Sequence, residues 1–255
     1  GAILDRVANV LFNISESDAT ESLQKIVEQA LPLISVHSDN IFMNPYFFAK
    51  VEKLYNDMDN LGLTQEQKMT LKKLYNSFVK NGIALGEAEQ ARMREINMEL
   101  SSLSNTFGNN LLAENNAFAE EFGVTISEYA GAMATTEDRT LREKMFKAYS
   151  SRGNNGNEND NKELIMKMMA LRVEKAKLLG YDNPAQMILA DKMAGTPEAV
   201  DVFLADIMAP AVAKAEAEIV DMQAVMDEDI KAGVLAEGSV IEPWDWAYYA
   251  EKVRK

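Results

Sequence analysis

The chain has no cysteine among its 255 residues and a single histidine, His37. Without cysteine it can form neither disulfides nor thiolate metal sites. One histidine cannot supply the paired imidazoles of an H-E-x-x-H zinc site or the paired E-x-x-H motifs of a di-iron bundle. No G-x-S-x-G segment is present, so a nucleophilic serine is not indicated. The residues predict no catalytic group and no metal site in this chain, and His37 is expected at the surface or at a helix end.

Positive charge is scarce, and long apolar runs are absent. The 26 basic residues are outnumbered by 40 acidic residues, which gives a net charge of −14. Such a charge repels phosphate backbones and anionic lipids, so neither nucleic acid nor a membrane is an expected partner. No apolar segment reaches the roughly 18 to 20 residues needed to cross a bilayer, and no targeting segment is recognisable. The composition fits a soluble protein, and it leaves cytoplasm and periplasm both open as its location.

Apolar residues recur at intervals of three and four along nearly the whole chain, which is the period of an amphipathic helix. Capping boxes are expected at Asp18 with Glu21 and at Thr64 with Gln67, and Thr136 is expected to cap a further helix. Other helix starts pair a capping residue with a proline at the first helical position, at Asn44-Pro45, Asn183-Pro184 and Thr196-Pro197. The sequence therefore predicts an all-α protein.

The spacing of the helices predicts a multi-helix bundle of long antiparallel helices, kinked at Pro32 and Pro210. Strand-like alternation occurs only around Val124 and Ile126, so at most one short strand fragment is expected near 124–126. We expect two helical subdomains, residues 1–118 and 119–255.

The core is predicted from the most apolar helical stretches. The segment 161–179 is expected to be central because its first turns are apolar nearly all round. The residues predicted to be buried are Leu164, Met168, Leu171, Leu178 and Phe203.

Two features could contact a ligand. The loop 153–161 is rich in asparagine and acids, but its glycines do not fall where an EF-hand requires one, so a solvated turn before a helix is the favoured interpretation over a calcium site. Trp244 and Trp246 could line a substrate channel, or they could simply pack at a helix start. The candidate substrate-channel residues are Trp244, Trp246, Asn154 and Asn155.

The last residues, "IEPWDWAYYAEKVRK" (241–255), have the pattern of a helix that Asp245 would cap. Trp246, Tyr249 and Val253 share its apolar face. The pattern has no terminating glycine or proline before the chain ends. We expect this face to be partly exposed, or covered by a neighbouring molecule in a non-native dimer of an otherwise monomeric protein.

Four stretches, in this order, resemble the thimet-oligopeptidase-like zinc metallopeptidases, family M3. They are "EINMELSSLSNTFGNNLLAENNAF" (95–118), "SRGNNGNENDNKELI" (151–165), "LRVEKAKLLGYDNPAQMILADKMAGTPEAVDVFL" (171–204) and "WDWAYYAEKVRK" (244–255). The asparagine-rich "RGNNGNENDN" resembles the bacterial peptidyl-dipeptidase (dipeptidyl carboxypeptidase) branch. Between Phe118 and Tyr129 the chain is shorter than is usual in the family, either naturally or because residues were removed.

The resemblance implies a mostly helical molecule split by a deep channel, with zinc held by an H-E-x-x-H helix downstream of the W-D-x-x-Y-Y segment. This chain has no positions that match those ligands, so zinc is expected only in a full-length parent, together with an oligopeptide substrate and a downstream catalytic half. The sequence is interpreted as the truncated, non-catalytic, channel-forming N-terminal part of a zinc peptidyl-dipeptidase that releases C-terminal dipeptides. The alternative is a stand-alone helical binding or scaffold domain without catalysis.

Overall fold

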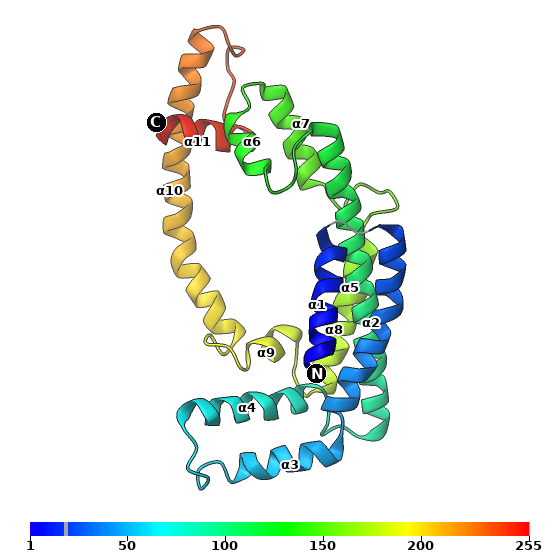
Figure 1. Cartoon of the computed structure of the whole chain (residues 1–255). Coiled ribbons are helices and arrows are strands. Elements are labelled where there is room, and N and C mark those ends of the chain that lie inside the picture. Colours follow the sequence, from blue (N-terminus) through cyan, green and yellow to red (C-terminus); the bar gives the residue numbers. More distant parts are fainter. Residues whose placement is uncertain (18–19, 255) are drawn as a thin grey trace. The chain divides into compact units, whose positions relative to one another are not determined.

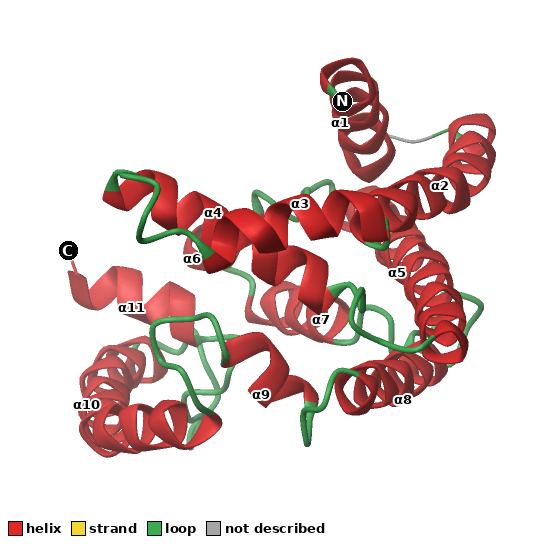
Figure 2. Ribbon diagram, turned by 90° about the horizontal axis from the view of Figure 1, so that it is seen from below, coloured by secondary structure: helices red, strands yellow, loops and turns green. Residues whose placement is uncertain are grey.

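The computed structural model describes residues 1–17 and 20–254, and its regular elements are helices. Figure 2 shows these helices joined by loops, with no strand among the residues described. The helices, labelled in Figure 1, are α1 (Ala2–Ser17), α2 (Glu21–Phe42), α3 (Pro45–Asn56), α4 (Gln65–Lys80), α5 (Glu87–Phe122), α6 (Tyr129–Thr135), α7 (Arg139–Ser150), α8 (Lys162–Leu178), α9 (Pro184–Leu189), α10 (Pro197–Lys231) and α11 (Trp246–Arg254). The all-α prediction is confirmed.

Several predicted helix starts are confirmed by cap hydrogen bonds. Thr64 and Gln67 form the reciprocal capping box of α4. Asn44, Asn183 and Thr196 each accept a backbone N–H three residues on, directly before the proline that opens the helix. A side-chain oxygen here satisfies an amide that has no partner within the helix.

One predicted cap differs from the structure, and another lies outside the described residues. The α7 cap is Asp138 rather than Thr136, because the Asp138 carboxylate accepts the N–H groups of Thr140 and Leu141. At the start of α2 the cap is Thr20, which accepts the N–H of Leu23. The box expected at Asp18 involves a residue outside those described.

Both internal prolines lie within continuous helices, Pro32 in α2 and Pro210 in α10. Figure 1 shows α10 as one long, bowed helix. Proline removes one N–H from the hydrogen-bond ladder without ending it here. Val124 and Ile126 lie in non-strand backbone after α5, and both side chains pack against the cluster around Phe118. Their alternation forms no strand because no described segment pairs with it.

The chain divides into two compact units, each built from two stretches of sequence. Unit 1 comprises Gly1–Asn109 and Glu163–Gly195, and unit 2 comprises Asn110–Lys162 and Thr196–Lys255. The predicted boundary at residue 118 stays a prediction.

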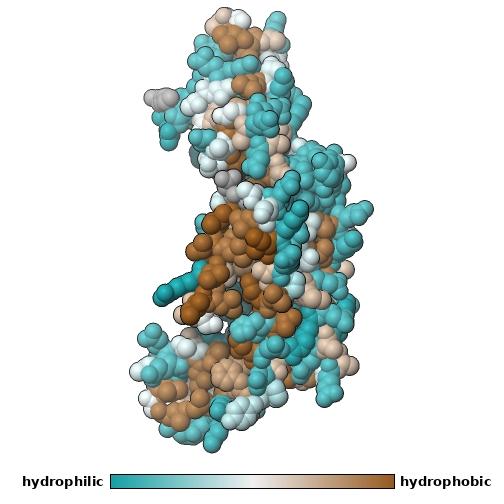
Figure 3. Space-filling model, turned by 45° about the vertical axis from the view of Figure 1, so that its right-hand side comes forward, coloured by the Kyte–Doolittle hydropathy of each residue, from teal (hydrophilic) through white to brown (hydrophobic). Residues whose placement is uncertain are grey.

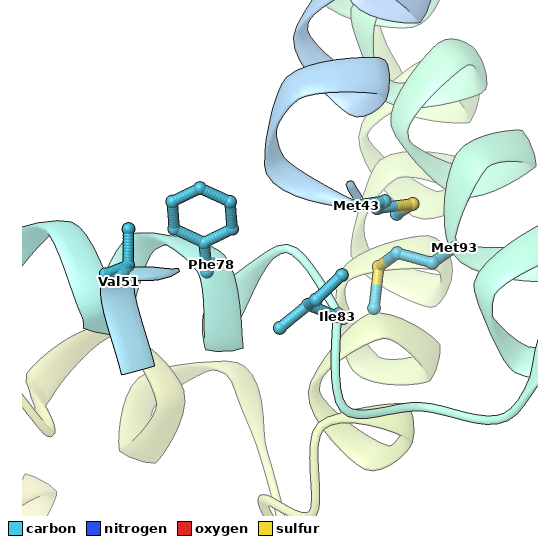
Figure 4. Packing of buried hydrophobic residues seen from close by; sticks show 5 residues of the cluster. All are labelled: Met43, Val51, Phe78, Ile83 and Met93. Carbon is cyan, nitrogen blue, oxygen red and sulfur yellow. The ribbon is translucent and has the colours of Figure 1, made fainter. Parts of the chain in front are cut away.

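The main core of unit 1 lies where α3 and α4 meet the loop that precedes α5. Figure 4 shows its five buried members, Met43, Val51, Phe78, Ile83 and Met93. Phe78 is surrounded by the rings of Phe42, Phe47 and Phe48, at centroid distances of 5.3, 5.6 and 5.7 Å. Aromatic pairs in this range stabilise a core beyond the area that they bury.

Unit 2 has two smaller clusters. One gathers Phe118, Met133 and Met145 from α5, α6 and α7, and the other gathers Met222, Met226 and Tyr249 from α10 and α11. Each cluster packs two methionines with one buried aromatic residue, and the flexible methionine side chain suits such irregular packing.

The predicted core is confirmed in part. Met168 and Leu171 are buried, whereas Leu164 and Leu178 are half-buried. Phe203 was wrongly predicted to be buried, because 62% of it is exposed. Residues 201–214 of α10 are exposed on every side, since α11 covers α10 only around Met222 and Met226. The segment 161–179 is not uniformly buried either, because α8 exposes Ile165, Met166 and Met169.

Exposed apolar side chains also line α1, at Ile3, Val7, Val10 and Ile14. In Figure 3, hydrophobic residues (brown) gather most densely in the middle of the face that is drawn. Across the described residues, no helix combines the length and the apolar character that crossing a bilayer requires.

Candidate functional site

Unit 2 holds the residues that the sequence singles out, in two groups. The first group centres on Asp245, whose side chain is fully buried just before α11. Arg139 Nη2 lies 2.7 Å from Asp245 Oδ2, and Arg142 Nη2 lies 2.8 Å from Asp245 Oδ1. The backbone N–H of Glu242 donates to the same carboxylate at 3.2 Å. Asp245 thus ties the start of α7 to the start of α11.

Asp245 lies directly before α11 and its carbonyl accepts the Tyr249 N–H, as predicted for the residue at the start of this helix, but its carboxylate has other partners. Its carboxylate is taken up by the two arginines and by an N–H that precedes it in the chain. Burial acts to raise the pKa of Asp245, but the hydrogen bonds from Arg139 and Arg142 outweigh it and lower the pKa below its ordinary value. The group therefore stays ionised inside unit 2.

A second carboxylate fixes the middle of α11. Asp229 of α10 accepts the Tyr249 hydroxyl at 2.9 Å and pairs with Lys252 Nζ at 2.7 Å. Burial and this carboxylate raise the pKa of the Tyr249 hydroxyl, which stays protonated as a donor. The Arg142 guanidinium stacks 4.2 Å from the Tyr248 ring centroid. Polar contacts on both sides of α11 thus define its position against α7 and α10.

The C-terminal face was predicted to be partly exposed, and the outcome is divided. Tyr249 is buried against α10, contrary to the prediction, because its ring joins the Met222–Met226 cluster and its hydroxyl has a partner. Trp246 and Val253 are 37% and 45% exposed, as predicted. Both line a groove of about 320 Å³ between α10 and α11, with Met222 and the charged residues Lys214 and Arg254.

Trp244 has a different setting from Trp246. Its ring packs edge-on against Phe146 of α7, with centroids 6.2 Å apart, and Lys147 Nζ lies 5.5 Å from its centroid. Trp244 therefore anchors the segment before α11 to α7, while Trp246 faces the groove.

The second group is the asparagine loop, residues 151–161, which follows α7. Glu114 of α5 is 7% exposed and holds this loop. Its carboxylate accepts the N–H of Gly153 at 3.1 Å, Asn155 Nδ2 at 2.6 Å and Asn157 Nδ2 at 2.9 Å. A buried carboxylate needs such donors to offset its lost hydration. Glu114 thus fixes the position of the loop through a buried carboxylate, as Asp245 does for the start of α11.

The loop also closes on itself. The Asp160 carboxylate accepts the backbone N–H of Gly156 and pairs with Lys162 Nζ at 2.7 Å. The hydrogen bonds from Lys162 and Gly156 lower the pKa of Asp160 to about 2. Gly153 has φ +70°, and a Cβ there would lie 3.0 Å from Asn161 Nδ2, so glycine fits this position for two reasons.

The structure places the predicted candidates in separate surroundings. Asn154 is exposed and accepts Lys162 Nζ at 2.7 Å, and Asn155 donates to Glu114. Trp244 packs against α7, whereas Trp246 lines the groove between α10 and α11. Sequence reasoning missed Glu114, although one signal pointed to it. Glu114 lies at helical spacing between Leu111 and Phe118, on the side of α5 that packs.

The chain's own residues do not fit a catalytic zinc. Such a site ordinarily needs three protein ligands and an open position. His37 is exposed on α2, and the described residues contain no group of three or more His, Cys, Asp or Glu side chains able to hold a metal ion.

Comparison with known proteins identifies relatives along the whole chain. The family description "Peptidase family M3" matches residues 132–255. The chain is 30% identical to dipeptidyl carboxypeptidase of Escherichia coli strain K12 in an alignment of 287 positions. The alignment covers 100% of the chain and 41% of that protein. It is 29% identical to the Salmonella typhimurium dipeptidyl carboxypeptidase, with the same coverage. It is 28% identical to Escherichia coli oligopeptidase A, over 99% of the chain and 42% of the relative.

The chain thus spans about 41% of the length of the dipeptidyl carboxypeptidases that it matches. The match to the family description and the similarity along the whole chain confirm the predicted resemblance, including the likeness to the dipeptidyl carboxypeptidase branch. Residues 132–255 thus match peptidase family M3, and the whole chain is similar to dipeptidyl carboxypeptidases.

Proposed function

We propose that this chain is the non-catalytic, channel-forming part of a longer zinc peptidyl-dipeptidase that releases dipeptides from the C-termini of oligopeptides. The observation that carries the proposal is the 30% identity to a dipeptidyl carboxypeptidase along the entire chain. Long helices such as α5 and α10, with 36 and 35 residues, suit an extended wall. Such a wall would act by exclusion, admitting unfolded oligopeptides to a buried site and rejecting folded proteins.

In the longer protein a zinc ion would supply the Lewis-acid chemistry of peptide hydrolysis. We place its ligands outside this chain, because the donors among residues 1–17 and 20–254 do not form a three-ligand set. The chain's own contribution would be to bind and orient the peptide.

Two surfaces of unit 2 are proposed to face the peptide. The groove beside Trp246 offers an aromatic face with charged residues at its edge, the mixture that ligand sites favour. The exposed Asn154 and Asn155 offer amide groups that match a peptide main chain. Trp244 would hold the segment that carries Trp246 in place.

The test has a genetic and an enzymatic part. The reading frame of the source gene would be sequenced on both sides of this segment, and the whole open reading frame would be expressed. A downstream H-E-x-x-H and chelator-sensitive release of a C-terminal dipeptide from a blocked oligopeptide support the proposal. A stop codon directly after Lys255 with no zinc motif elsewhere would overturn it and favour the stand-alone binding or scaffold domain.

A further inference from the structure

A pocket of about 300 Å³ lies in unit 2 between the last turns of α5 and the asparagine loop. Its apolar side is formed by Ala117, Phe118 and Ala148. Its polar side carries the two carboxylates of Glu114 and Glu121, the Arg152 guanidinium, and the amides of Asn155, Asn157 and Asn159. Its volume is at the lower end for ligand sites and suits one side chain better than a whole peptide.

The two carboxylates in this pocket differ in their partners. Glu114 and Glu121 are seven residues apart, two turns along one face of α5. Glu114 is occupied by the three N–H donors of the loop. Glu121 is exposed, and in the described part of the chain no hydrogen bond or ion pair engages its carboxylate. Glu121 is therefore a charged acceptor open to a ligand.

The single cation of the pocket is already engaged. Arg152 donates from Nη1 to Asn115 Oδ1 at 2.6 Å and from Nε to the Tyr149 carbonyl at 2.9 Å. Its guanidinium also lies 3.9 Å from the Tyr149 ring centroid. Two carboxylates against one guanidinium leave the pocket with a net negative charge. An anion would meet Glu121, whereas a cation would gain Glu121 as its counter-ion.

Neutral acceptors line the same pocket as this carboxylate. Asn155 uses its Nδ2 on Glu114, and within the described residues neither its side-chain oxygen nor the side-chain amide of Asn159 is hydrogen-bonded. A guanidinium or ammonium carries several N–H donors and requires several acceptors at once. Glu121 and the two amide oxygens line one pocket and offer three such acceptors.

We propose that this pocket binds a basic side chain of a peptide, with Glu121 as its counter-ion. The choice of a peptide as ligand rests on the proposed function, and the preference for a cation rests on the pocket itself. The substrates selected by this surface would be oligopeptides that carry arginine or lysine.

The first experiment titrates the ¹⁵N-labelled 255-residue chain with Nα-acetyl-arginine amide, followed by NMR. Nα-acetyl-citrulline amide is the matched probe, because it has nearly the same shape without the charge. We expect saturable shifts of the Asn155 and Asn159 side-chain amides with the arginine probe and weaker binding of the citrulline probe. Equal binding of the two probes, or no shift of these amides, would overturn the proposal.

Variants then assign the counter-ion. Glu121→Gln should weaken binding of the arginine probe by about fivefold, the upper value for a partly exposed ion pair. Glu120→Gln is the matched control, since the Glu120 carboxylate is next to Glu121 in sequence and exposed but does not line the pocket. Equal losses in both variants, or no loss in Glu121→Gln, would contradict the assignment. The titration uses this chain alone, so its outcome is independent of whether the source gene encodes a peptidase.

Discussion

Single charged residues buried in unit 2 hold segments that are distant along the chain. Asp245 is the clearest case, because it is fully buried and meets Arg139 across 106 residues of sequence. Arg142, itself 1% exposed, binds the same carboxylate and the carbonyl groups of Thr136 and Glu137. Removing the carboxylate would take away the ion-pair partner that the two arginines share, and one of these arginines is buried.

Asp245→Asn is therefore expected to destabilise the protein by about 3 to 5 kcal/mol, the range for breaking a buried ion pair on one side. Denaturant unfolding followed by circular dichroism measures the change. Asp201→Asn, at an exposed position of α10, is the control and should stay within about 0.5 kcal/mol. A loss below about 1 kcal/mol for Asp245→Asn would mean that the pair contributes little.

The stability contribution of the Asp245 carboxylate should also depend on pH. Because the pKa of Asp245 is lowered in the folded state, its contribution is fully present above the ordinary aspartate pKa of about 3.9 and is lost as the pH falls through the folded value. The parent protein should lose more free energy of unfolding between about pH 5 and pH 2 than Asp245→Asn. Parallel curves for the two proteins would contradict the lowered pKa.

Whole helices differ in how much of their apolar surface is covered. α8 buries Met168 and Leu171 within unit 1 but exposes 71% of Met166. α10 buries Met222 and Met226 near its end and exposes its first half. Position along a helix thus decides burial as much as residue type does.

Leu171→Ala should cost about 2 to 5 kcal/mol, because Leu171 is only 8% exposed and its truncation removes buried apolar contacts. Met166→Ala on the same helix is the matched control and should change the free energy of unfolding by less than about 0.5 kcal/mol. Similar costs for the two variants would show that α8 does not pack on one face.

The two ends of α10 provide a second contrast. Met226→Ala is expected to cost about 2 to 5 kcal/mol, since Met226 is fully buried under α11. Phe203→Ala should have little effect in this chain because its ring is exposed. Thermal melts of the two variants measure the stability lost by each. A large loss of stability from Phe203→Ala would indicate that a partner covers this residue in solution.

The molecule as a whole is expected to be inactive by itself. The purified chain should retain less than one equivalent of zinc after dialysis and should not hydrolyse a blocked oligopeptide, because one exposed histidine cannot supply the strong nitrogen ligands of a hydrolytic site. Metal analysis and a peptide-release assay test this. One retained equivalent, or turnover that chelator abolishes and zinc restores, would point to a missed site, with His37 as the first residue to replace.

Local sequence was enough for the helices and for most of their boundaries. A cap such as Thr64 with Gln67 involves residues three apart, and a proline after Asn44 or Thr196 acts on its own turn. These interactions depend only on neighbours in the chain, so they could be predicted without knowing the fold.

The candidate site could not be predicted in the same way. Its neighbours place Asp245 at the start of a helix, but the two arginines that bind its carboxylate lie more than 100 residues away. Glu114 reaches its donors across 39 to 43 residues. Phe203 has the apolar character of a core residue, yet its burial depends on whether another segment covers α10. Apolar periodicity fixes which face of a helix can be buried, but only the path of the distant chain determines which part of that face finds a partner.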